Sequence, residues 1–196
     1  MKLILKKAFL FTTICCSFLL SRSQEVKLGI IAGPNLNTIR LQDGTTKMLG
    51  SGTGYHAGAI ARVQFSPNFA IQPQLMITSR GGKWSTTSDI NTKLTGLDLP
   101  INFLYTEKNF FAGGGPSFRY GLSASFESEG VKINAYKPMD EAYLFKRFEI
   151  GASLVAGYKL NNGLFFSASF NPSITDISQA FEVKNNTVGL SVGFLF

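Results

Sequence analysis

The end of the chain alternates between two kinds of side chain. Bulky apolar residues occupy every second position near the C-terminus, namely Val188, Leu190, Val192, Phe194 and Phe196. The small or polar residues Thr187, Gly189, Ser191 and Gly193 alternate with them, and residues 186–196 carry no charge. Because successive side chains of a β-strand point to opposite faces, this strand has one apolar face and one small, polar face. An uncharged strand of this kind is typical of a membrane β-barrel, with the apolar face toward lipid.

The same alternation divides the preceding sequence into strands. Together with the last segment it predicts eight strands, at residues 26–37, 54–65, 69–83, 93–105, 110–124, 147–160, 163–174 and 185–196. Short turns at 66–68, 106–109 and 161–162 alternate with longer polar stretches at 38–53, 84–92, 125–146 and 175–184. Short turns on one side and long loops on the other are typical of outer-membrane barrels. The predicted fold is therefore all-β, an eight-stranded antiparallel up-and-down transmembrane β-barrel.

Charged residues within the predicted strands fall on the face opposite the apolar one, except near strand ends. The inward set consists of Arg62, Arg80, Asp98, Arg119 and Glu149. The interior of an eight-stranded barrel is just wide enough for side chains to fill it, so we expect these groups to pair as a lumenal charge network. A plug of salt bridges is the favoured interpretation. A pore or gate lined by the same charges is the alternative.

The N-terminus has the pattern of a secretory signal peptide. A basic start is followed by an uncharged, mostly apolar stretch of 13 residues, and small residues precede Gln24. As a helix, this stretch would span roughly 20 Å, which is shorter than the ~30 Å hydrocarbon core and disfavours a membrane anchor. We therefore predict a cleaved signal peptide at 1–23 and an outer-membrane β-barrel domain at 24–196.

Cleavage would change the composition of the mature protein. Both cysteines, Cys15 and Cys16, lie in the predicted signal peptide, so the mature chain would have no disulfide. Four of the 19 basic residues also leave, and the remaining 15 against 12 acidic residues give a net charge of +3 instead of +7. No basic cluster remains on any one predicted strand, so we expect no nucleic-acid partner.

The sequence offers little sign of catalysis. The one histidine, His56, is predicted to point into the lumen, where a hydrogen-bonded structural role is the common one. Residues 189–193 have the GxSxG spacing, but they lie inside the last predicted strand and not at a strand-to-helix turn, so they do not form a nucleophile elbow. No group of residues has metal-ligand spacing. The triple glycine at 113–115 is not followed by GK[ST] and does not indicate a phosphate-binding loop. We therefore predict no enzymatic activity, no catalytic residue, no cofactor and no metal.

The third long loop, 125–146, mixes aromatic and acidic residues. Its candidate contact residues for a protein partner are Phe126, Tyr136, Tyr143 and Phe145. Loops on a rigid scaffold commonly carry binding functions. The alternative is that this loop folds back over the mouth of the barrel.

Several short pieces resemble a known family. The segments 54–58 (GYHAG), 70–75 (AIQPQL), 97–101 (LDLPI), 111–116 (FAGGGP) and 151–158 make the chain similar to PorT-like small outer-membrane β-barrel proteins. The architecture is that of the OmpA-type eight-stranded barrels. The resemblance implies a place in the outer membrane of a Gram-negative bacterium, surrounded by outer-membrane lipid. It also implies that the terminal aromatic residues Phe194 and Phe196 are read by the barrel-assembly machinery. The alternative is that Phe196 only anchors the last strand in lipid.

Two functions from different classes remain open. The first is a non-enzymatic integral outer-membrane barrel with a side-chain-filled lumen. It would serve structure, surface interaction, or assembly and secretion through its extracellular loops. One branch of the PorT-like family assists secretion, although the fold alone does not assign that role. The alternative is a soluble exported barrel of the lipocalin type that binds a small apolar ligand, which requires apolar side chains inside and charges outside.

Overall fold

The computed structural model describes residues 25–43, 45–83, 91–128, 131–134, 146–176 and 183–196. Nine strands form from this part of the chain: β1 (Glu25–Asp43), β2 (Thr45–Ser66), β3 (Phe69–Lys83), β4 (Asn91–Glu107), β5 (Phe110–Ser128), β6 (Val131–Asn134), β7 (Phe148–Lys159), β8 (Leu164–Pro172) and β9 (Val183–Leu195). None of the described residues belongs to a helix long and apolar enough to cross a membrane.

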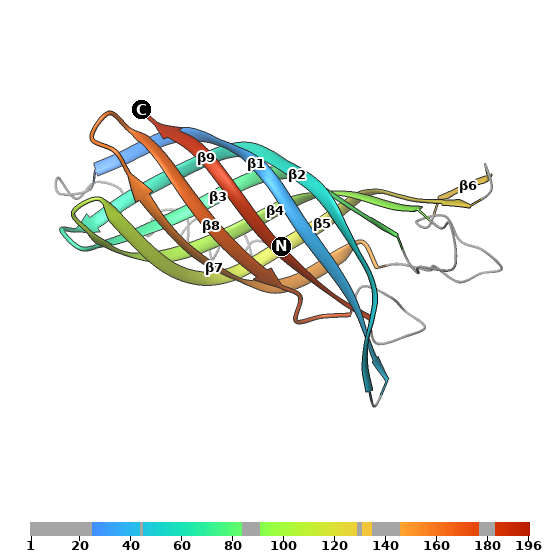
Figure 1. Ribbon diagram of the computed structural model, residues 1–196. Helices are drawn as coiled ribbons and strands as arrows, with labels where there is room; N and C mark the ends of the chain where they lie inside the picture. Colours follow the sequence, from blue (N-terminus) through green and yellow to red (C-terminus); the bar gives the residue numbers. More distant parts are fainter. Residues whose placement is uncertain (1–24, 44, 84–90, 129–130, 135–145, 177–182) are drawn as a thin grey trace, which may run out of the picture.

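Eight of these strands close into one antiparallel barrel (Figure 1). The strand order is β4-β3-β2-β1-β9-β8-β7-β5, and the pairing of β4 with β5 closes the ring. The first and last strands meet side by side, with Gly29 opposite Leu195, and the amide of Phe196 donates to the carbonyl of Leu28 at 2.8 Å. The predicted eight-stranded up-and-down barrel is confirmed, and closure leaves the ring without a free edge.

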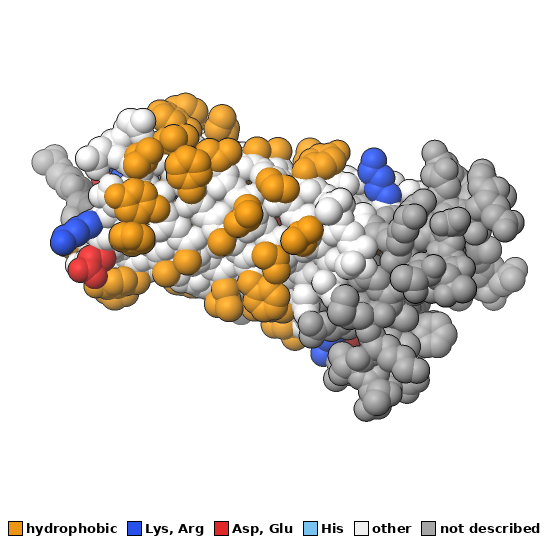
Figure 2. Space-filling view, in the orientation of Figure 1, with side chains coloured by type: hydrophobic (Ala, Val, Ile, Leu, Met, Phe, Trp, Pro, Cys, Tyr) orange, Lys and Arg blue, Asp and Glu red, His pale blue; other side chains and the backbone are white. Residues whose placement is uncertain are grey.

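The outer wall of the barrel is apolar. The larger exposed side chains on it include Leu28, Ile30, Leu75, Ile77, Phe103, Leu154, Phe166, Leu190 and Val192. Figure 2 shows apolar side chains spread along the wall and charged ones gathered toward its ends. Inside, Arg62, Arg80, Asp98 and Arg119 are each at most 7% exposed. A soluble lipocalin-type barrel requires the reverse arrangement, so that alternative is not favoured.

Aromatic rings surround the end of the barrel that carries the short turns. The rings of Phe65 and Phe69 stack at 6.4 Å, and Phe69 meets Tyr105 edge-on at 5.5 Å. Phe110 and Tyr158, which are cross-strand partners, meet at 4.8 Å. These side chains are exposed on the outer wall. Such a girdle is found where barrel walls cross the membrane interface.

The strands extend farther at the opposite end than the sequence predicted. Residues 38–53 were expected to be a loop, but β1 and β2 stay paired as far as Asp43 and Thr45. The expected loop 125–146 includes the end of β5 and the short strand β6, which pairs with β5 outside the ring (Figure 1). Alternation arises because one face of each strand must be apolar to meet lipid. Beyond the membrane this requirement ends, although strand pairing continues. The pattern therefore fades before the strands do.

A bulge changes one predicted facing in β5. Thr95 lies opposite Ser123, whereas Gly96 lies opposite Gly121, so Leu122 is an extra residue in the pair. Strict alternation from the inward-facing Arg119 would turn Ser123 toward the lumen, but Ser123 is exposed and the neighbouring Ala124 is buried instead. A bulge of this kind shifts the alternation of all following residues by one position.

The outer wall can be tested with a single charge. Leu154 lies midway along β7 and is 55% exposed. We expect Leu154→Arg to lower the free energy of unfolding from lipid vesicles by about 2–4 kcal/mol, because it places a cation near the bilayer midplane. The control Asn161→Arg adds the same charge to an exposed turn. Equal effects of the two variants on chemical unfolding would contradict the placement of this wall in lipid.

Candidate functional site

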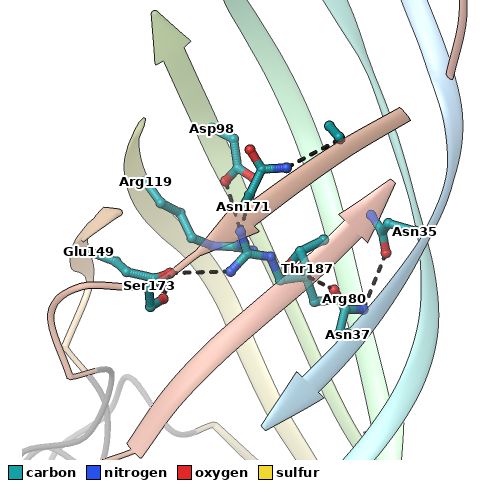
Figure 3. A network of polar contacts seen from close by, with 10 residues as sticks. Asn35, Asn37, Arg80, Asp98, Arg119, Glu149, Asn171, Ser173 and Thr187 are labelled. Atoms are coloured by element: carbon teal, nitrogen blue, oxygen red, sulfur yellow. Dashed lines mark hydrogen bonds and ion pairs between the residues drawn. The ribbon is translucent and has the colours of Figure 1, made fainter. Parts of the chain in front are cut away.

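Four charged side chains meet in the lumen, in the half of the barrel away from the short turns (Figure 3). Each comes from a different strand: Arg80 from β3, Asp98 from β4, Arg119 from β5 and Glu149 from β7. Strand register positions them, since Asp98 is the cross-strand partner of Arg119, and Arg119 is also the partner of Glu149. Charges of alternating sign therefore face one another across three neighbouring strands, an arrangement that favours pairing.

Arg80 joins the two carboxylates of this lumenal cluster. Its Nη2 lies 3.3 Å from Oδ2 of Asp98, and its Nη1 lies 3.3 Å from Oε1 of Glu149. Arg119 Nη1 lies 3.5 Å from Oδ1 of Asp98, and the hydroxyl of Ser173 donates to Glu149. Two cations thus offset two anions. Their side chains are only 6–12% exposed, so the attraction is much less screened than at a surface.

Arg62 lies apart from this cluster, although it was expected to belong to the same network. It is buried near the end with the short turns, where its Nε donates to Oε1 of Gln72 at 2.8 Å. Its guanidinium group lies 4.4 Å from the centre of the Phe111 ring. No carboxylate of the described residues forms an ion pair with it. Arg62 therefore needs an explanation different from that of the other four residues.

Hydrogen-bonding side chains fill the middle of the lumen. His56 Nε2 lies 2.8 Å from Oγ of Ser191, so this contact joins β2 to β9 past the intervening strand β1. Thr187 donates to Oδ1 of Asn37 at 3.2 Å, and Nδ2 of Asn37 donates to Oδ1 of Asn35 at 3.2 Å (Figure 3). The cavity that remains is about 30 Å³, enough for a water molecule or two.

An apolar layer closes the lumen between this polar middle and the end of the barrel that carries the short turns. It consists of Ile31, Ile60, Ala70, Leu104, Phe111, Val155, Phe165 and Leu195. The Phe111 and Phe165 rings meet edge-on at 6.1 Å, and each lies over the glycine opposite it in register, Gly157 and Gly193 respectively. A Cβ on Gly193 would lie 2.2 Å from the Phe165 ring. Glycine is therefore required there for the ring to cross the lumen.

The remaining predicted residues have different positions. Phe196 is exposed on the outer wall and Phe194 is partly exposed, with their ring centres 5.4 Å apart. Phe126 belongs to β5. Tyr136, Tyr143 and Phe145 lie outside the described residues. Within the described part of the chain, no group of three or more His, Cys, Asp or Glu residues could hold a metal ion.

The sequence matches a known family over most of its length. Residues 21–179 match the family described as outer membrane protein beta-barrel domain. No curated protein matches the sequence.

The fold is shared with known outer-membrane barrel structures. One of them is Ail, the attachment invasion locus protein of Yersinia pestis, at 19% identity and a TM-score of 0.50. Another is Neisserial surface protein A, at 14% identity and a TM-score of 0.54. In both comparisons the match covers 88% of this chain and 99% of the other chain. At these identities the likeness concerns the fold. Closure of the ring and the apolar outer wall agree with the sequence match, and the chain belongs to the family of outer-membrane β-barrel proteins.

Proposed function

We propose that this protein is a non-enzymatic, non-conducting barrel of the Gram-negative outer membrane that acts through its outer strands and loops. The filled lumen carries the proposal. Phe165 is 0% exposed and Leu104 is 1% exposed in the apolar layer, and paired charges occupy the other half. An interior filled in this way supports a rigid scaffold rather than a path for solutes. The pore interpretation of the lumenal charges is correspondingly disfavoured.

The outer end offers the working surface. The β1–β2 hairpin stays paired to Asp43 and Thr45, and β6 adds a second projection beside β5. Strands that project beyond the membrane on a closed barrel suit contact with another protein, in surface interaction or in assembly and secretion. Phe126 at the end of β5, with Tyr136, Tyr143 and Phe145 after it, remains part of this proposed contact surface.

The biogenesis of the barrel is part of the same proposal. A signal peptide at 1–23 would export the chain, and the barrel-assembly machinery would read the terminal strand through Phe194 and Phe196. The exposed ring of Phe196 is accessible for such reading and would afterwards lie in outer-membrane lipid. The pieces quoted above from 54–58 onward support a PorT-like member of the family.

Site-specific photocrosslinking in cells tests the proposed surface. A crosslinking amino acid at Thr46, in the outer part of β2, is expected to capture a defined protein partner. The matched control carries it at Asn161, in a short turn at the other end of the barrel. Partner adducts from Asn161 and none from Thr46 or Phe126 would overturn the assignment of the outer end as the working surface.

A further inference from the structure

The end of the barrel with the short turns contains a second cavity, which we call the vestibule. It has a volume of about 310 Å³, and Phe111 of the apolar layer is part of its lining. Four cationic side chains, Lys27, Arg62, Lys108 and Lys159, line it together with a single carboxylate, Glu25. In outer-membrane barrels this end faces the periplasm.

The cations of the vestibule are held close together by the fold. Lys27 on β1 and Arg62 on β2 are direct cross-strand partners, a placement that is unfavourable for like charges. Lys159 at the end of β7 lines the same cavity and is near enough to interact with the charges of both, and with that of Glu25. Glu25 lies 3.0 Å from Lys27, but its side chain is 66% exposed, so it offsets only part of the positive charge.

Arg62 forms the inner wall of the vestibule. Its residue exposure is 5%, Gln72 accepts from its Nε, and Phe111 packs against its guanidinium group. The buried Nη2 atom has no hydrogen-bond partner among the described residues. A buried charged donor without a partner is costly, so an anion that accepted from it would add a hydrogen bond that the side chains do not provide.

We propose that the vestibule binds a phosphate-type oxyanion, held at its inner side by Arg62 and at its rim by Lys27 and Lys159. The planar guanidinium fork matches the geometry of phosphate oxygens, and lysine adds point charges at the rim. The volume exceeds that of a single phosphate group, so a diphosphate or the head group of a phospholipid fits. Glu107 does not oppose this site, because it lines the outer wall beside Tyr105 instead.

Phosphorus NMR on protein extracted from outer membranes into neutral detergent tests the proposal. Pyrophosphate is titrated at constant ionic strength into the wild type and into the double variant Lys27→Gln/Lys159→Gln. The matched control, Lys146→Gln/Lys184→Gln, removes the same charge at the opposite end of the barrel. We expect the dissociation constant to rise at least tenfold in the vestibule variant and less than twofold in the control. The vestibule variant changes only the rim residues Lys27 and Lys159. Gel mobility before and after heating verifies that each variant is folded.

A parallel titration identifies the source of the phosphate. Short-chain phosphatidic acid is added to the same micelles in place of pyrophosphate. Selective loss of affinity for pyrophosphate in the vestibule variant supports a soluble oxyanion. Selective loss of affinity for phosphatidic acid in that variant supports a lipid head group. Absence of binding by both probes would overturn the proposal. Equal weakening in the vestibule variant and the control would also overturn it, because only general charge attraction would then remain.

Discussion

Replacing Asp98 with asparagine is expected to lower the free energy of unfolding by about 3–5 kcal/mol, the cost of breaking a buried ion pair from one side. Its carboxylate lies 3.3 Å from Arg80 and 3.5 Å from Arg119, and both arginine side chains are at most 8% exposed. The substitution keeps the shape and removes the charge, so Glu149 alone would face two buried cations. Chemical unfolding of the protein in phospholipid vesicles measures the loss.

The control for this experiment is Glu107→Gln, which makes the same chemical change at an exposed position. Glu107 accepts a long hydrogen bond of 3.4 Å from Tyr105 and forms no ion pair among the described residues. Its substitution is expected to change stability by no more than about 0.5 kcal/mol. If Asp98→Asn changed stability as little as Glu107→Gln does, the lumenal cluster would be solvated and would not stabilise the barrel.

The second large effect is expected at Phe165. Its side chain is 0% exposed and fills the apolar layer against Phe111. Phe165→Ala should lower the free energy of unfolding by about 3–5 kcal/mol, because transfer energy is lost and a cavity remains. The adjacent Phe166 lies on the outer wall at 51% exposure and provides a control of the same residue type.

Phe166→Ala should lower the free energy of unfolding by a smaller amount, about 1.5–3 kcal/mol. The variant loses the apolar surface that the ring buries in the membrane, but lipid fills the space that the ring occupied. The difference between the losses of unfolding free energy in the two variants gives the cost of the cavity alone. Both losses are measured by the same unfolding experiment in vesicles. A larger loss for Phe166→Ala than for Phe165→Ala would contradict the closed apolar layer.

Much of the barrel could be predicted because strand alternation reports directly on the two environments of the wall. In β9 it assigned Leu190 and Phe196 to the outside and Thr187 to the inside, as the structure has them. The extension of β1 and β2 was missed because outside the membrane both faces of a strand meet water. The bulge at Leu122 was missed because an extra residue leaves no mark in residue type.

The interior was harder to predict, because alternation gives the face of a residue but not its depth along the barrel. Arg62 was grouped with the other inward charges for this reason, although strand stagger places it in the vestibule. Phe111 and Phe165 were overlooked, yet each neighbours an outward-facing phenylalanine. Two adjacent phenylalanines in one strand must send one ring inward, and this signal could have located the apolar layer.

The most direct test of the account is an ion-flux measurement on vesicles that contain the purified protein, with a large porin as the positive control. Gel mobility of the protein recovered from the vesicles, with and without boiling, shows that it is inserted and folded. The filled lumen predicts a flux equal to that of empty vesicles while the unboiled protein retains its folded mobility. A steady flux through protein with folded mobility would contradict the filled lumen and restore the pore interpretation of the lumenal charges.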